Sequence, residues 1–128
     1  MVEELKINSE KNFVNLEQAI TEGSNALIPY QFDYPNTDLT VEVQLKPITN
    51  PELTRIAQES ELSGDSLDVG LIAKAMYNTD GTLFEKELIE KLPAGVVLKL
   101  SFKIMDISGM DIEELRNRQS SISQLQGF

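Results

Sequence analysis

Two runs of alternating apolar and polar residues lie side by side in the first half of the chain and are joined by a short turn. Apolar side chains at every second position are typical of a β-strand with one buried face. The joining segment, Pro35–Asp38, has the proline, asparagine and aspartate content of a chain reversal. The sequence therefore predicts an antiparallel hairpin over residues 26–46. Its apolar face would consist of Ala26, Ile28, Tyr30, Phe32, Tyr34, Leu39, Val41, Val43 and Leu45.

This hairpin constrains the rest of the fold. An isolated hairpin is only marginally stable in water, so its apolar face must pack on helices or on another chain. The residues that follow supply helical patterns. We predict helices over about 51–61, 67–77, 83–91 and 93–108.

Boundary signals support these helices. Asn50 precedes proline and glutamate, and we expect it to cap the first helix. Thr82–Glu85 has the sequence of a capping box and would open the third. Gly109 suits a left-handed cap after the fourth, which is apolar nearly all round and is expected at the centre of the bundle. The expected inward residues of the first two helices are Leu53, Ile56, Ala57, Leu67, Leu71, Ile72, Ala75 and Met76.

The predicted elements define the fold class and the organisation of the chain. We expect an α+β protein, mainly α-helical, with four to five short helices and one antiparallel β-hairpin near the N-terminal side. Residues 1–25 form an N-terminal arm, in which Phe13, Leu16 and Ile20 favour a short helix that packs on something. Residues 26–110 form a single globular domain. Residues 111–128 form a C-terminal helix and a fraying tail.

Composition restricts the classes of function. The chain has 128 residues, and 21 acidic against 11 basic residues give a formal net charge of −10 at pH 7. Such a charge repels nucleic acid and anionic membrane surfaces, so we expect neither as a partner. The sequence contains no cysteine and no histidine, which removes thiolate nucleophiles and the commonest general base at neutral pH. The acidic N-terminus does not resemble a signal peptide, and we expect a cytoplasmic protein.

One stretch has the outline of a calcium loop. In Met76–Glu87, Gly81 falls at the sharp turn, Asn78 and Asp80 offer oxygen atoms, and Glu87 takes the bidentate position. The first ligand position, however, is Met76, and a thioether does not bind a hard cation. We therefore predict a turn followed by a helix, and no metal or cofactor site.

The sequence does not predict catalytic residues either. The carboxylates that cluster along the chain fall on faces that the helical pattern leaves in water, where nothing raises their pKa for proton transfer. We therefore expect a protein without enzymatic activity. The clustered carboxylates are Glu85, Glu87, Glu90, Glu113 and Glu114.

A short apolar stripe follows the globular domain. Ile112, Leu115, Ile122 and Leu125 would share one face of a continuing helix, with Gln119 in the intervening position of a heptad-like pattern. Such an interrupted stripe suits reversible binding of a partner. Equally, Ile112 and Leu115 could join the core while the remainder frays. The two interpretations stay open at this stage.

The segment from Leu45 to Ile112 resembles the tail assembly chaperones of long-tailed bacteriophages and related prophages. The resemblance rests on the order and spacing of its pieces and covers about half of the chain. The pieces are a sheet-like stretch at Leu45–Thr49, a helix at Pro51, a helix containing Leu71–Met76, a short helix leading to Leu88–Gly95, and a long apolar helix from Val96 to Gly109.

The resemblance implies a role in tail assembly. Such proteins bind the long, apolar, helical tape measure protein, keep it soluble, and help to recruit tail tube protein subunits around it. They act in the cytoplasm of the host cell, are generally absent from the finished virion, and have no catalytic residues to carry over. In many relatives a programmed frameshift gives a longer second product. A homo-oligomer is compatible with this role.

Two alternatives come from other classes of protein. The first is a structural subunit of the tail or its connector, in which the hairpin joins a ring by pairing of edge strands. The second is an acidic inhibitor that mimics nucleic acid. The inhibitor requires its negative charges on one face, whereas the sequence distributes them along the helices. We therefore favour the chaperone first and the structural subunit second.

Overall fold

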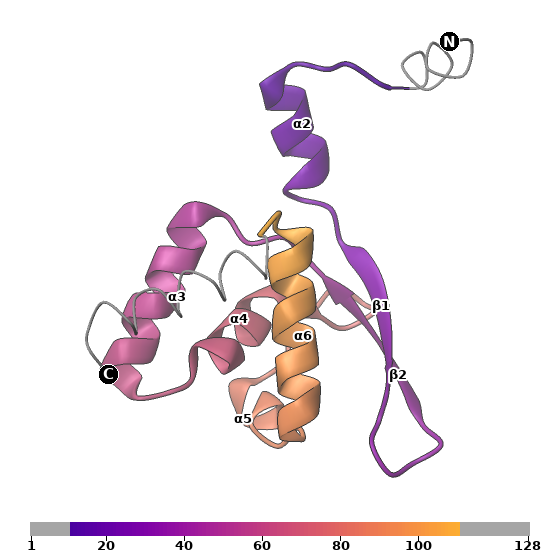
Figure 1. The fold of residues 1–128 in the computed structure, drawn as a ribbon, viewed down its shortest axis with the longest axis vertical. Coiled ribbons are helices and arrows are strands. Elements are labelled where there is room, and N and C mark those ends of the chain that lie inside the picture. Colours follow the sequence, from indigo (N-terminus) through magenta and orange to yellow (C-terminus); the bar gives the residue numbers. More distant parts are fainter. Residues whose placement is uncertain (1–10, 111–128) are drawn as a thin grey trace, which may run out of the picture.

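The computed structural model describes residues 11–110 (Figure 1). This part of the chain is α+β and rich in helices, with an antiparallel hairpin near the N-terminal side, as predicted, and the hairpin belongs to a three-stranded antiparallel sheet. The elements in chain order are α2 (Leu16–Gly23), β1 (Ile28–Asp33), β2 (Thr40–Leu45), α3 (Asn50–Ser63), α4 (Leu67–Ala75), β3 (Met76–Tyr77), α5 (Lys86–Ile89) and α6 (Ala94–Ile107).

The predicted hairpin is confirmed. Strands β1 and β2 pair in the register Tyr30 with Val43 and Phe32 with Val41, which places the apolar residues of both strands on one face. The turn is closed by a hydrogen bond from the Tyr34 amide to the Leu39 carbonyl, 2.9 Å long. The opposite face of the hairpin is largely polar and faces solvent.

The sheet has a third strand that the sequence pattern did not predict. We expected a helix over 67–77, but α4 ends at Ala75, and Met76 and Tyr77 pair antiparallel with Leu45 and Gln44 of β2. Met76 is only 4% exposed in this position. The same side chain would satisfy a helical or an extended pattern, and pairing with the exposed edge of β2 decides between them. At the start of α4, Leu67 is 44% exposed, so its predicted burial was wrong.

Helix α3 begins after a capping residue and ends at a glycine, but the capping residue differs from the predicted one. The cap is Thr49, not Asn50: the Thr49 hydroxyl accepts from the Glu52 amide, and the Glu52 carboxylate accepts from the Thr49 amide. Gly64 ends the helix with a φ of 78°, in the left-handed region that favours glycine. Ile56 is buried, whereas Ala57 is exposed, contrary to the predicted face.

The third predicted helix, 83–91, is mostly turn and loop. Thr82 does not cap a helix; its hydroxyl donates to the Asp80 carboxylate over 2.6 Å. Leu83 forms an isolated antiparallel bridge with Tyr77, so the chain leaves the turn extended. Only Lys86–Ile89 is helical, and Glu85 precedes it without a side-chain cap. A local turn held by Asp80 therefore replaces the predicted capping box.

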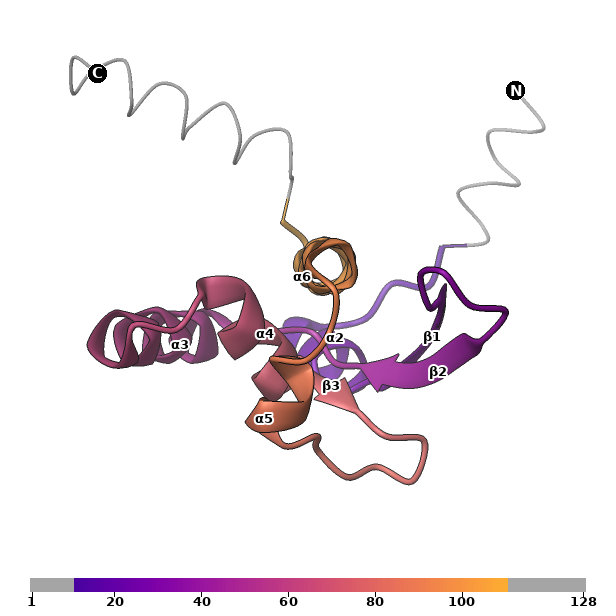
Figure 2. The same cartoon turned by 90° about the horizontal axis from the view of Figure 1, so that it is seen from below.

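Helix α6 closes the core from one side of the layer formed by α3, α4 and the sheet (Figure 2). It was expected at the centre of the bundle, but Leu98 is 47% exposed, so only one face of α6 is covered. A buried hydroxyl, that of Ser101, donates to Asp68 of α4 over 2.6 Å and fixes the two helices together. The buried apolar core consists of Phe32, Val43, Leu45, Ile48, Ile56, Leu71, Ile72, Ala75, Met76, Ile89, Val96, Leu100 and Ile104.

The N-terminal arm contains a helix, as the spacing indicated. Helix α2 is capped by Asn15, whose side chain accepts from the Gln18 amide over 2.8 Å. Phe13 lies before this cap and not on the helix. Every residue from 11 to 23 is exposed, so the expected packing of the arm is not formed within the described part of the chain.

Candidate functional site

An open apolar groove lies between the hairpin and the segment around α5. Its volume is about 250 Å³. One wall is the apolar face of β1 and β2, the floor includes Met76 of β3, and the other wall comes from α5 and its flanking residues. We call this the apolar groove; its lining residues are Phe32, Tyr34, Val41, Val43, Met76, Phe84, Leu88, Ile89, Lys91 and Leu92.

Local structure around the turn places the second wall. Gly81 adopts a φ of 89°, and the Asn78 amide donates to the Thr82 carbonyl over 2.7 Å, which reverses the chain after β3. The Tyr77–Leu83 bridge then directs the chain toward α5. As a result Phe84 and Leu88 line the same groove as residues of β1 and β2 more than 40 positions earlier in the sequence.

The groove leaves apolar side chains open to solvent at its edge. Phe32, Val43 and Ile89 are buried at its base, whereas Leu88 at its edge is 54% exposed. Among the described lining residues Lys91 alone is charged. A concave surface of this composition gains stability by covering its apolar atoms, because each buried Å² of apolar area contributes about 25 cal/mol.

A second apolar surface belongs to the arm. Leu16 and Ile20 are four residues apart and therefore share one face of α2. Their exposed fractions are 75% and 51%, and that of Phe13 just before the helix is 83%. We call Phe13, Leu16 and Ile20 the arm surface. Within the described residues this surface is largely exposed to solvent.

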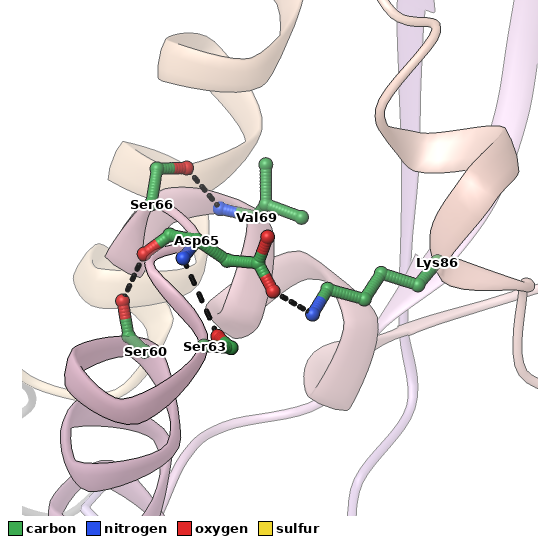
Figure 3. A network of polar contacts seen from close by, with 6 residues as sticks. All are labelled: Ser60, Ser63, Asp65, Ser66, Val69 and Lys86. Atoms are coloured by element: carbon green, nitrogen blue, oxygen red, sulfur yellow. Dashed lines mark hydrogen bonds and ion pairs between the residues drawn. The ribbon is translucent and has the colours of Figure 1, made fainter.

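A larger groove of about 320 Å³ runs between α3 and α4, but polar contacts account for much of it. The Ser60 hydroxyl donates to the Asp65 carbonyl, the Ser63 hydroxyl accepts from the Asp65 amide, and the Lys86 ammonium donates to the Asp65 carboxylate (Figure 3). The Ser66 hydroxyl accepts from the Val69 amide and caps α4. These contacts join the end of α3 to the start of α4, a structural role.

In this polar groove, the contact between Asp65 and Lys86 shifts both pKa values in the direction that favours the charged forms. The hydrogen bond from Lys86, followed by the contact with the Ser63 hydroxyl, lowers the pKa of Asp65 below its usual value. The same contact with Asp65 raises the pKa of Lys86. A carboxylate held ionised in this way is a poor general acid at neutral pH. The groove therefore does not resemble a proton-transfer site.

The other candidate residues from the sequence, those of the calcium-loop outline and the clustered carboxylates, do not form a site in the described residues. Met76, the first residue of the calcium-loop outline, is buried in β3, and residues 78–82 form a turn. Glu85, Glu87 and Glu90 are exposed. Within residues 11–110, no group of three or more acidic side chains is arranged to hold a metal ion. The partner-binding candidates Ile112, Leu115, Ile122 and Leu125, with Glu113 and Glu114, lie outside the described residues.

Sequence reasoning did not predict the apolar groove as a site. The alternation of β1 and β2 identified one wall, and Phe84 and Leu88 were assigned to a helix, but their meeting depends on the turn at Gly81 and on β3. No signal in the sequence alone joins the hairpin to the 83–92 segment.

Comparison of the chain with protein family models, with characterised proteins and with solved structures finds no match. In the described region, no helix combines the length and apolar character needed to cross a bilayer.

Proposed function

We propose that this chain is a tail assembly chaperone of a long-tailed bacteriophage or prophage, which binds apolar helical segments of the tape measure protein. The observation that carries this proposal is the apolar groove, which is open and has a single charged residue in its described lining. The resemblance of Leu45–Ile112 to such chaperones supplies the identity of the client. The groove supplies a surface to which the client could bind.

The binding mode follows from the shape and charge of the surface. An amphipathic helix binds a groove by inserting apolar residues spaced three or four positions apart. Covering those residues would keep the client from aggregating before tail tube protein subunits surround it. The net charge of −10 would keep the loaded complex soluble, because the complexes repel one another. This role requires no catalysis and takes place in the host cytoplasm, and the protein would be absent from the finished virion.

Co-expression with the tape measure protein tests the proposal. The chain should increase the soluble fraction of the client and co-purify with it. Leu88→Gln removes an exposed apolar contact from the groove and should weaken binding at least tenfold, since a buried leucine contributes roughly 1.5–3 kcal/mol. Leu98→Gln on α6 is the matched control, because Leu98 is similarly exposed and does not line the groove.

Two results of these experiments would contradict the proposal. If the client stays insoluble and forms no complex, the chaperone proposal is wrong. If Leu88→Gln and Leu98→Gln bind the client equally well, the groove is not the binding surface.

The structural subunit of the tail or connector is the second candidate, and one observation favours it. Strand β1 lies at the edge of the sheet, so its outer backbone groups are available to another strand. Pro29 lies within β1 and lacks an amide hydrogen, which weakens pairing along this edge. Detection of the chain in purified particles would support the structural subunit over the chaperone.

A further inference from the structure

Helix α2 is short, and none of its faces is covered within the described residues. It has eight residues, and isolated helices shorter than about 12–15 residues are marginal in water. None of its residues is buried in the described structure. Packing of an apolar face is the usual source of stability for such a helix, and the arm surface provides that face.

The apolar groove matches the arm in chemistry. Leu16 and Ile20, on one face of α2, are the pair of anchors that a helix-binding groove takes. The charges are complementary as well: α2 carries Glu17 and Glu22, whereas the charged residue of the described groove lining is Lys91. The same chain therefore presents an uncovered apolar helix with acidic flanks and an uncovered apolar groove whose described lining has one charged residue, Lys91.

The position of the arm points to a groove on another molecule. Helix α2 and the turn of the hairpin lie at opposite ends of the structure, and α5 lies toward the hairpin end (Figure 1). The arm is joined to β1 by the four residues 24–27. To reach its own groove, α2 would have to reverse direction and run back along β1. The groove of a second copy does not require this reversal.

We infer that two copies of the chain exchange their arms, so that the arm surface of each copy binds the apolar groove of the other. The exchange is reciprocal, and one two-fold axis relates both contacts. Such an interface is closed and gives a dimer, not a filament. The inference does not depend on the proposed function, since the exchange involves only this chain. The arm and a client helix would bind the same groove, so the arm occupies it in the free dimer and a bound client displaces the arm.

Cross-linking provides a direct test, because the chain has no cysteine of its own. Ile20→Cys and Leu88→Cys are prepared as separate full-length proteins, mixed, and oxidised gently. Exchange predicts a disulfide-linked dimer containing one molecule of each variant. The matched control pairs Ile20→Cys with Leu62→Cys, since Leu62 on α3 is 90% exposed and lies outside the groove. This control pair should cross-link at least tenfold less.

Three cross-linking results would overturn the inference. The first is an equal yield from the control pair. The second is a dimer formed by Ile20→Cys alone with the same yield, which would indicate pairing of α2 with α2. The third is an internal disulfide in a monomer carrying both Ile20→Cys and Leu88→Cys, which would show that the arm binds its own groove.

Sedimentation of the full chain adds a reversible measurement. We expect a dimer whose dissociation constant rises at least tenfold in Leu16→Gln and in Leu88→Gln, and stays unchanged in Leu62→Gln. Lys91→Glu should weaken the dimer, and Glu17→Lys in the same chain should restore part of the affinity. A monomer at all concentrations would overturn the arm exchange while leaving client binding by the groove intact.

Discussion

Gly70 of α4 lies against Ile56 of α3 so closely that a β-carbon at position 70 would be 2.8 Å from the Ile56 Cγ2 atom. Ile56 is 5% exposed and branched at its β-carbon, so its methyl group cannot move aside freely. The glycine thus allows α3 and α4 to approach. Helix α4 continues directly into β3, whose Met76 lines the apolar groove.

Gly70→Ala should destabilise the protein. Alanine is better than glycine in a helix by roughly 0.5–1 kcal/mol, but overpacking of a core typically costs about 1–3 kcal/mol. The expected net loss is about 1 kcal/mol in the free energy of unfolding, measured by urea denaturation. Gly95→Ala is the matched control: a β-carbon there contacts nothing within 4 Å, so this variant should be as stable as the wild type or more stable. A Gly70→Ala protein of wild-type stability would contradict the close approach.

Thr49→Ala should lower the free energy of unfolding by about 1 kcal/mol, the usual effect of losing a helix cap. The Thr49 hydroxyl accepts from the Glu52 amide, and alanine leaves that donor without its partner. Asn50→Ala is the control, and it should change stability by less than about 0.5 kcal/mol because Asn50 already lies within α3. Thr49→Ser should retain most of the stability. Equal losses for Thr49→Ala and Asn50→Ala, again in urea, would argue against Thr49 as the cap.

Helix α3 is capped by Thr49 and not by the predicted Asn50, and this illustrates how much of the fold can be predicted from the sequence. The hairpin was predictable, because alternation with a period of two and a polar turn leave few other structures open. The boundaries of 67–77 and 83–91 were not, because Met76 suits a helix or a strand and Thr82 suits a helix cap or an Asp80 turn. Pairing with β2 selects the strand and the turn. The apolar groove depends on that selection, so local patterns alone could not predict it.

Acid should destabilise the protein in part through Glu52. Partial burial opposes ionisation of this carboxyl, but hydrogen bonds from the Thr49 amide and hydroxyl and the charges of Lys46 and Lys74 outweigh it, so its pKa is lowered in the folded state. A carboxyl with a lower pKa in the folded chain stabilises the fold above its unfolded pKa. That contribution disappears as the pH falls through the folded pKa.

Glu52→Gln tests this contribution, because glutamine keeps the size of the side chain and its oxygen acceptor but does not titrate. The free energy of unfolding, measured by urea denaturation between pH 7 and pH 3, should fall less steeply for Glu52→Gln than for the wild type. Part of the acid sensitivity should remain in the variant, since hydrogen bonds from Lys86 and Thr82 also lower the pKa values of Asp65 and Asp80. Identical pH profiles for the two proteins would show that Glu52 does not couple folding to protonation.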